Sequence, residues 1–185
     1  MIDIWLVRHG EASASWDVSP DPGLSALGRE QAVRASEQLL AMVPEGVDII
    51  SSPLVRTQET SAPFAEGRGQ LITLNAAFRE LPSPVPLAER HTWLKIFMHQ
   101  TWDQQQPEQW AWRENIIAAL MAVTKPTVIF THFMVINAVL AHIQQQSATV
   151  QALPANGSIH HLRLQEADAQ LILVALGEQL NSDVL

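Results

Sequence analysis

The chain of 185 residues contains no cysteine. Disulfide bonds, thiolate nucleophiles and zinc sites built from cysteine are therefore excluded. The chain also lacks an apolar run long enough to cross a membrane. Its first ten residues, MIDIWLVRHG, do not place a basic stretch before an apolar signal core. Together these absences predict a cytoplasmic protein that is not bound to a membrane.

Basic residues are scarce, with 11 Lys and Arg against 19 Asp and Glu and a formal net charge of −8. This balance argues against nucleic-acid binding, which needs a basic surface. It allows a small anionic substrate, because a few Arg and His side chains in one pocket can outweigh a diffuse negative surface. With 47% hydrophobic and 16% charged residues, we expect a globular protein with a single domain over 1–185.

Short apolar runs alternate with amphipathic stretches along the chain. The runs predict strands at 2–7, 47–51, 70–74, 127–131, 158–164 and 171–176. The other stretches predict helices at 26–42, from about 54, and at 88–101, 107–124 and 134–144. Ser25 is the expected N-cap of the first helix, and Ser52 with Pro53 the expected start of the second. The alternation predicts an α/β fold, a three-layer αβα sandwich with a mostly parallel sheet and helices on both faces.

Three clusters of polar residues follow predicted strands. They are RHGE at 8–11, SSPLVR at 51–56 and TH at 131–132. Because ligands bind at the carboxyl ends of strands in open parallel sheets, these clusters should converge on one pocket. The two Arg and two His that they contain suit a phosphate dianion. Guanidinium groups hold phosphate oxygens in a bidentate way, and imidazole can donate to them or attack phosphorus.

Five segments carry a resemblance to a known family. They are LVRHGEA at 6–12, LSALGREQA at 24–32, SSPLVRTQET at 51–60, FRE at 78–80 and VIFTH at 128–132. With these segments the chain resembles the histidine phosphatase (phosphoglycerate mutase-like) superfamily, on its phosphatase branch. An isolated RHG would be weak evidence. Five segments in family order, each in the expected strand or helix context, are a specific signal.

The resemblance implies a role for each matched basic residue. His9 would attack phosphorus and become phosphohistidine. Arg8, Arg56 and His132 would hold the phosphate oxygens and stabilise the charge that develops in the transition state. His132 would thereby take part both in catalysis and in phosphate binding.

The resemblance also implies that Glu80 protonates the leaving oxygen and then activates the water that hydrolyses the intermediate. Glu11 and Asp17 are the alternative carboxylates for the acid role. A neutral imidazole attacks without first losing a proton, so this chemistry needs no metal. We therefore expect neither a metal nor a cofactor.

The implied function is that of a metal-independent phosphomonoesterase, which hydrolyses a small phosphorylated metabolite through a phosphohistidine intermediate. Three alternatives stay open: a phosphoglycerate mutase-type phosphotransferase, a protein phosphohistidine phosphatase and a non-catalytic phosphate-binding regulatory module. The sequence gives no sign of a particular oligomeric state. The remaining histidines match no motif, and we interpret them as structural or surface residues: His91, His99, His142, His160 and His161.

Residues 81–113 differ in composition from the rest of the chain. The stretch LPSPVP at 81–86 is incompatible with a regular helix or a central strand. Four tryptophans follow it: Trp93, Trp102, Trp110 and Trp112. We interpret the segment as a small helical insertion or cap. Its aromatic side chains either pack onto the sheet domain or form an apolar lid that selects the leaving group.

Overall fold

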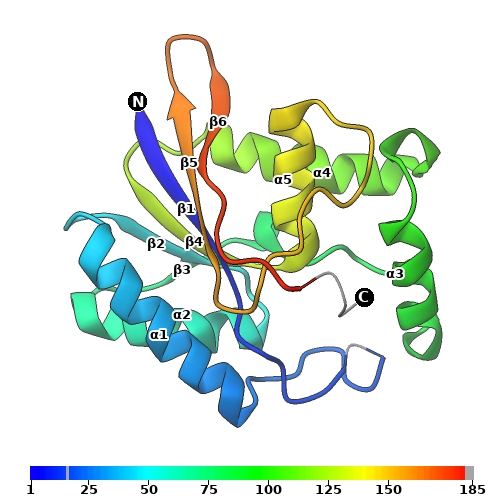
Figure 1. Cartoon of the computed structure of the whole chain (residues 1–185), viewed down its shortest axis with the longest axis horizontal. Coiled ribbons are helices and arrows are strands. Elements are labelled where there is room, and N and C mark those ends of the chain that lie inside the picture. The colour runs from blue at the N-terminus through cyan, green and yellow to red at the C-terminus, as the bar shows by residue number, and fades with distance from the viewer. Residues whose placement is uncertain (16, 182–185) are drawn as a thin grey trace.

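A computed structural model describes residues 1–15 and 17–181 of the chain, so residue 16 and the end of the expected domain, 182–185, lie outside the described part. Within that part, one sheet holds six strands in the order β3-β2-β4-β1-β5-β6 (Figure 1). The strands are β1 (Ile2–Arg8), β2 (Asp48–Ser51), β3 (Thr73–Leu74), β4 (Thr127–Thr131), β5 (Ile159–Gln165) and β6 (Gln170–Ala175).

The helices cover both faces of this sheet. They are α1 (Ala26–Met42), α2 (Val55–Arg68), α3 (Arg90–Met98), α4 (Pro107–Met121) and α5 (Phe133–Gln144), with 3₁₀ turns at Ala76–Phe78, Leu87–Glu89 and Trp102–Gln104. In Figure 1, α1 and α2 lie on one side of the sheet and α4 and α5 on the other. None of the helices in the described residues has the length and apolarity needed to span a membrane.

Most of the sheet is parallel. β1 and β2 both pair in parallel with β4, and β3 pairs in parallel with β2. β5 is antiparallel to β1, and β6 is antiparallel to β5. The predicted αβα sandwich is therefore confirmed. The predicted strand at 70–74 is shorter than expected, because Leu71 is 94% exposed and only Thr73–Leu74 reach the edge of the sheet.

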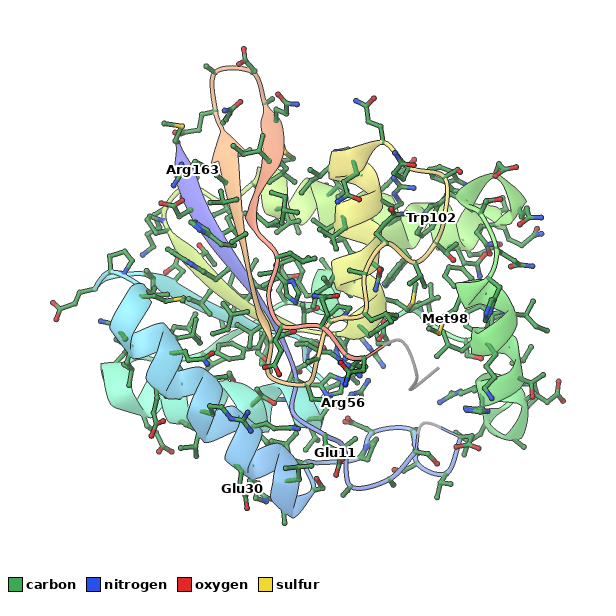
Figure 2. The ribbon with its side chains drawn as sticks, in the orientation of Figure 1. Glu11, Glu30, Arg56, Met98, Trp102 and Arg163 are labelled. Atoms are coloured by element: carbon green, nitrogen blue, oxygen red, sulfur yellow. The ribbon has the colours of Figure 1, made fainter. Side chains whose placement is uncertain are left out.

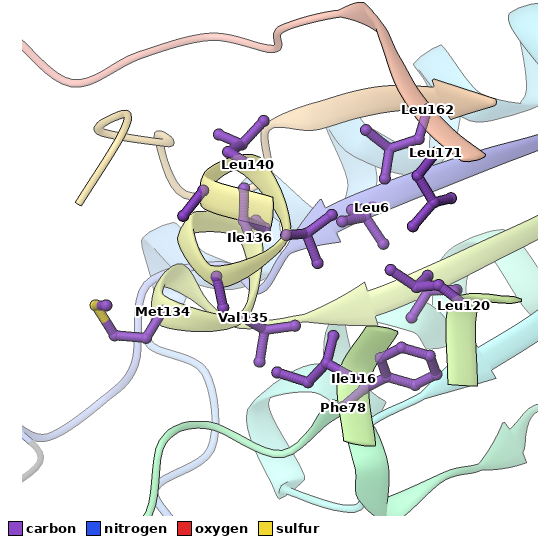
Figure 3. Packing of buried hydrophobic residues seen from close by; sticks show 14 of the residues in the cluster. Leu6, Phe78, Ile116, Leu120, Met134, Val135, Ile136, Leu140, Leu162 and Leu171 are labelled. Atoms are coloured by element: carbon purple, nitrogen blue, oxygen red, sulfur yellow. The ribbon is translucent and has the colours of Figure 1, made fainter. Parts of the chain in front are cut away.

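Both faces of β1 are buried. Ile4 and Leu6 belong to a core cluster with side chains of α4 and α5, whereas Trp5 and Val7 belong to a second cluster with side chains of α1 and α2. Successive side chains of a strand point to opposite faces, so the continuous apolar run at the start of the chain serves both layers. Figure 3 shows Leu6 among the labelled residues of the first cluster.

The two predicted helix starts differ in outcome. The Ser25 hydroxyl oxygen accepts from the Gly28 amide at 3.0 Å and caps α1, as predicted. The second helix was expected from about residue 54, and α2 begins at Val55, but its N-cap is Leu54 and the predicted cap at Ser52 is wrong. The Ser52 amide donates to the Phe130 carbonyl at 3.0 Å, so residue 52 still takes part in strand pairing. Its hydroxyl oxygen accepts from the Leu54 amide at 3.3 Å, before the helix begins.

The tryptophans of 81–113 pack against one another and against the core. Trp102 is buried and lies edge-on to Phe97, with ring centroids 5.9 Å apart. The ring centroids of Trp110 and Trp102 are 5.5 Å apart, and the guanidinium carbon of Arg113 lies 4.6 Å from the Trp102 ring centroid. Figure 2 labels Trp102 well away from Arg56. Of the two readings of these aromatics, the arrangement favours packing.

Candidate active site

The polar residues that follow β1, β2 and β4 lie side by side at the carboxyl end of the sheet. The His9 amide donates to the Thr131 carbonyl at 3.0 Å, and the Ser52 amide donates to the Phe130 carbonyl at the same distance. Strand pairing thus continues one residue beyond β1 and β2. It brings the three polar clusters of the sequence to one place, where Figure 2 labels Arg56.

The His9 ring is held in one tautomer. Its Nδ1 donates to the Gly10 carbonyl at 2.6 Å. Its Nε2 accepts from the Arg56 Nε–H at 3.1 Å, because a guanidinium can only donate. The lone pair is therefore on Nε2. Burial, followed by the positive charges of Arg56 and Arg8, holds the pKa of His9 well below its ordinary 6.5, so the ring is neutral.

Arg56 also contacts the second histidine. Its Nη2 donates to His132 Nδ1 at 3.1 Å, and His132 Nε2 donates to the Ser52 hydroxyl oxygen at 2.8 Å. His132 is fully buried, and its ring centroid lies 5.2 Å from that of His9. Burial, followed by the charge of Arg56, lowers the pKa of His132 as well. One guanidinium thus orients two neutral imidazoles.

Arg8 forms a hydrogen bond with a backbone carbonyl and contacts an aromatic ring. Its Nη1 donates to the Pro154 carbonyl at 2.6 Å, and its guanidinium carbon lies 5.1 Å from the Phe133 ring centroid. Burial lowers the pKa of Arg8 to about 10, against the opposing effect of Glu80, so it stays charged at neutral pH. Arg8 Nε and Arg56 Nη1 are buried and have no hydrogen-bond partner within the described residues. Such donors suit an anionic ligand.

Glu80 approaches the same region from the segment after β3. Its carboxylate oxygens accept from the Leu81 amide at 2.9 Å and from the Met134 amide at 3.3 Å. Burial raises the pKa of Glu80 above its ordinary 4.5, and these amides together with Arg56 and Arg8 oppose the shift. A carboxyl of raised pKa retains its proton at a higher pH than an exposed one, as a general acid requires.

The two alternative acids have different surroundings. Glu11 accepts from the Ser25 hydroxyl at 2.7 Å and is exposed. A hydrogen bond from Ser15 lowers the pKa of Asp17, which favours its ionised form. Asp17 is therefore less suited than Glu80 to donate a proton.

These groups meet at a cavity of about 400 Å³. Arg8, His9, Arg56 and Glu80 all line it, together with residues of α3, α5, the loops at 11–22 and 154–158 and the segment after β6. His132 is fully buried and contacts this set through Arg56. The structure thus brings all five predicted residues together, with four of them at the cavity wall.

The loop at 154–158 forms hydrogen bonds with the backbone of Arg8 and His9. The sequence did not predict these contacts. Asn156 Nδ2 donates to the His9 carbonyl at 3.1 Å, and the Gly157 amide donates to the Arg8 carbonyl at 3.0 Å. Gly157 has a φ of 76°, a conformation that glycine adopts readily. The Asn-Gly pair was the available signal of a turn here, but it does not indicate what the turn contacts.

Two glycines explain why segment 24–32 accompanies the RHG motif. A Cβ on Gly10 would lie 2.3 Å from the Gly28 carbonyl oxygen, and a Cβ on Gly28 would lie 2.1 Å from the Glu11 carbonyl oxygen. In addition, Gln31 Oε1 accepts from the Glu11 amide at 2.7 Å. The start of α1 therefore packs directly against the backbone that follows His9.

Two of the other histidines have structural partners. His160 is buried and accepts from the Gly177 amide at 3.1 Å through Nδ1, so its Nε2 donates to the Ser158 hydroxyl oxygen at 2.8 Å. His161 lies 2.8 Å from Asp3 and stacks on Trp5. In the described part of the chain, no group of three or more His, Asp or Glu side chains is placed to hold a metal ion.

Comparison with known proteins establishes the class of protein that this fold and this site define. The sequence model of the histidine phosphatase superfamily (branch 1) matches residues 4–176. The chain therefore belongs to the histidine phosphatase superfamily.

Among curated proteins, the chain is similar to two proteins named probable phosphoglycerate mutase GpmB. The one from Citrobacter koseri is 33% identical over 112 residues, which cover 57% of this chain and 49% of the relative. The one from an Enterobacter species is 32% identical over 124 residues, which cover 63% and 50%. The chain thus spans about half the length of the curated relatives that it matches.

Three solved structures share the fold over nearly their whole length. YhfR of Bacillus stearothermophilus has a TM-score of 0.78 at 18% identity, covering 96% of this chain and 98% of that one. A mycobacterial glucosyl-3-phosphoglycerate phosphatase in complex with inorganic phosphate has a TM-score of 0.74 at 21% identity, with coverages of 97% and 98%. Phosphoserine phosphatase of Entamoeba histolytica, in complex with 3-phosphoglyceric acid, has a TM-score of 0.71 at 19% identity and full coverage of both chains.

Proposed function

We propose that this chain is a phosphomonoesterase that hydrolyses a small phosphorylated metabolite through a phosphohistidine on His9. One observation carries the proposal. A neutral, buried imidazole and Glu80, a carboxyl of raised pKa, line the same cavity as two arginines. A nucleophile, a proton donor and two cations for phosphate are the parts that hydrolysis of a phosphate ester requires.

In the first half of the reaction, Arg56 Nε–H leaves His9 Nε2 and turns to a phosphate oxygen. The freed lone pair of His9 Nε2 attacks phosphorus and the ester P–O bond breaks. The leaving oxygen keeps the electron pair of that bond and takes the proton of Glu80. Phosphorylation makes the imidazole cationic, and donation from Nδ1 to the Gly10 carbonyl at 2.6 Å stabilises this charge. Arg8 and Arg56 hold the non-bridging oxygens of the phosphoryl group and stabilise the negative charge on them during the transfer.

In the second half, the Glu80 carboxylate takes a proton from a water molecule as the water oxygen attacks phosphorus. The N–P bond breaks and its electron pair returns to His9 Nε2. The products are inorganic phosphate, a neutral imidazole and a protonated Glu80, so the site is ready for another turnover. Each step uses groups of this chain, and the proposed activity is independent of metal and cofactor.

A phosphoglycerate mutase is the second candidate, because the curated relatives carry that name. A mutase returns the phosphoryl group to its substrate and must also bind the substrate carboxylate. Among the described residues that line the cavity, the cations are Arg8 and Arg56. Both are assigned to phosphate here, so hydrolysis is the better supported reaction.

Trapping of the phosphoenzyme tests the proposal. With labelled phosphate monoester in excess EDTA, the protein should release inorganic phosphate and carry label that is acid-labile and alkali-stable, as phosphoramidates are. His9→Ala should abolish the label. His99→Ala, which changes an exposed histidine on the helical segment, should retain it. Label that persists in His9→Ala would exclude His9 as the nucleophile.

The alternatives predict different products in the same assay. Transfer of label to added phosphoglycerate in preference to water would identify a mutase. Hydrolysis of a phosphohistidine-bearing protein in preference to small esters would identify a protein phosphatase. Phosphate binding with neither label nor product would identify a non-catalytic regulatory module.

A further inference from the structure

The cavity beside His9 has walls of two kinds. The phosphate-binding donors of Arg8 and Arg56 make up the cationic part. Much of the remaining wall is apolar and comes from four separate parts of the chain: Pro22, Leu94, Met98, Phe133, Met134 and Leu180. A phosphate ion alone needs no such wall, so the apolar part is available to whatever the phosphate is esterified to.

Helix α3 presents one side to this cavity. Leu94 and Met98 are four residues apart, which places them on the same face of the helix. Both line the cavity and are partly buried, whereas Ile96 on the same helix is 55% exposed. At the start of α5, Phe133 supports the Arg8 guanidinium. The apolar wall therefore begins directly beside the cation that is assigned to phosphate.

The charges of the cavity disfavour a second anionic group on the substrate. Among its described lining residues, Arg8 and Arg56 are the cations, and Glu11 and Glu80 are the acids. A carboxylate on the leaving group would lose water against apolar side chains without gaining a cation. It would also approach the carboxylate of Glu11.

We infer that the substrate is a phosphate monoester of an apolar, uncharged alcohol, whose hydrocarbon part packs against Leu94, Met98 and Phe133. The inference rests on the proposed function, since it concerns the leaving group of that reaction. The inserted segment 81–113 then sets specificity through α3 and not through its tryptophans. The flexible Met98 side chain allows hydrocarbon groups of more than one shape.

A series of alkyl phosphates tests this inference. We would measure kcat/KM for ethyl, butyl, hexyl and 2-phenylethyl phosphate, and for 3-phosphoglycerate and phosphoserine. All of these leave as alkoxides, so the need for proton donation is similar throughout. We expect kcat/KM to rise roughly threefold for each added methylene until the cavity is filled. Hexyl phosphate should exceed both phosphorylated acids by about two orders of magnitude.

A flat alkyl series, or faster hydrolysis of 3-phosphoglycerate or phosphoserine, would overturn the inference. The second result would direct attention to a neighbouring hollow of about 380 Å³, which shares Glu80 with the cavity and is also lined by Arg79 and Arg90.

Paired variants on α3 locate the specificity. Met98→Lys adds a cation to the apolar wall, and we expect kcat/KM to fall about tenfold or more for hexyl phosphate and to rise for 3-phosphoglycerate. Met98→Gln, which is uncharged and of similar size, should lie between Met98→Lys and the wild type. Ile96→Lys makes the same change on an exposed side of α3 and should leave the substrate ratio unchanged. An unchanged ratio in both Met98 variants would contradict the inference.

The labelled phosphoenzyme formed from p-nitrophenyl phosphate separates the two possible failures. If it forms while the alkyl series is flat, the proposed function stands and the apolar leaving group is rejected. If neither label nor product forms with any of these esters, both proposals are rejected. The melting temperature of each α3 variant shows whether a changed ratio comes from a folded enzyme.

Discussion

Burial shifts the pKa values of His9 and Glu80 in opposite directions, and both shifts favour the form that the proposed reaction uses. A buried imidazole is disfavoured as a cation, so the pKa of His9 falls below 6.5 and its Nε2 lone pair is retained. A buried carboxyl is disfavoured as an anion, so the pKa of Glu80 rises above 4.5 and its proton is retained.

These two shifts predict a bell-shaped dependence of kcat/KM on pH. His9 must be neutral, so activity is lost as the pH falls through the lowered pKa of His9. Glu80 must be protonated, so activity is lost as the pH rises through the raised pKa of Glu80. With alkyl phosphates, Glu80→Gln should slow the first half-reaction by roughly a hundredfold or more and remove the alkaline limb.

The control for this prediction uses a second cavity-lining carboxylate and a better leaving group. Glu11→Gln should keep the alkaline limb. In Glu80→Gln, p-nitrophenyl phosphate should still give a burst of nitrophenol, since nitrophenolate leaves without a proton, followed by slow hydrolysis of the phosphoenzyme. If the limb disappears in Glu11→Gln and persists in Glu80→Gln, the acid role belongs to Glu11.

Among the elements, α1 and the loop after β1 are joined by contact between backbones at Gly28 and Gly10. In Gly28→Ala the new Cβ would lie 2.1 Å from the Glu11 carbonyl oxygen, so loop and helix must separate. We expect a loss of about 2 kcal/mol in the free energy of unfolding. Activity should fall as well, because the displaced loop carries the Gly10 carbonyl that orients His9. Urea unfolding and kcat together measure the effect.

Gly67→Ala is the matched control in α2. Its new Cβ would lie 3.0 Å from a side-chain carbon of Leu40, and this partly exposed side chain can move. Replacing glycine within a helix also improves helix propensity by about 1 kcal/mol. We therefore expect Gly67→Ala to be neutral or stabilising. Equal losses of unfolding free energy in both variants would show that the backbone contact at Gly28 does not account for the loss in Gly28→Ala.

The elements that the sequence predicted best are those with local signals at both ends. The predicted bounds of α1 and β4 agree with the structure. Ser25 caps the start of α1, and polar residues mark the ends of the buried apolar run in β4. The groups at the ends of β1, β2 and β4 could be predicted to meet, because a parallel sheet places its carboxyl ends at one edge. Glu80, the proposed acid, was suggested by the family resemblance, because no local pattern distinguishes a carboxylate before a proline-rich turn.

Other parts of the site had no such signal. Asn156 reaches the His9 carbonyl only because β5 returns antiparallel to β1, and no local pattern encodes that pairing. Ser52 was predicted as a helix cap, yet its hydroxyl accepts from His132. The apolar wall formed by Leu94 and Met98 depends on where α3 docks. Tertiary contacts of this kind decide the surroundings of a site whose central residues can be read from the sequence.

In the whole molecule, buried histidines couple stability to pH. His9, His132 and His160 are buried, and burial lowers the pKa of each. In the unfolded chain these rings would titrate near 6.5. As the pH falls below that value, the unfolded state binds protons that the folded state does not, so the folded state loses stability until the pH reaches the folded pKa.

His160 gives this effect a size, because burial lowers its pKa to about 4. Between pH 7 and pH 5 it should remove about 2 kcal/mol from the free energy of unfolding. His160→Gln should flatten the dependence of stability on pH by that amount, whereas His99→Gln, at an exposed position, should not. Urea unfolding at pH 7, 6 and 5 measures both variants. Parallel curves for wild type and His160→Gln would show that another group governs the acid sensitivity.

The long sequence separation between His9 and the residues that hold it has a consequence for protein synthesis. His9 is at the end of the first strand, but it is oriented by Arg56 and its backbone is held by Asn156, which follows it by 147 residues. β1 is completed as a central strand only when β4 and β5 have joined it. During synthesis, the segment that bears His9, the proposed nucleophile, therefore emerges long before the segments that orient it and hold its backbone. Fragments that stop before Asn156 and β5 should accordingly lack the proposed activity.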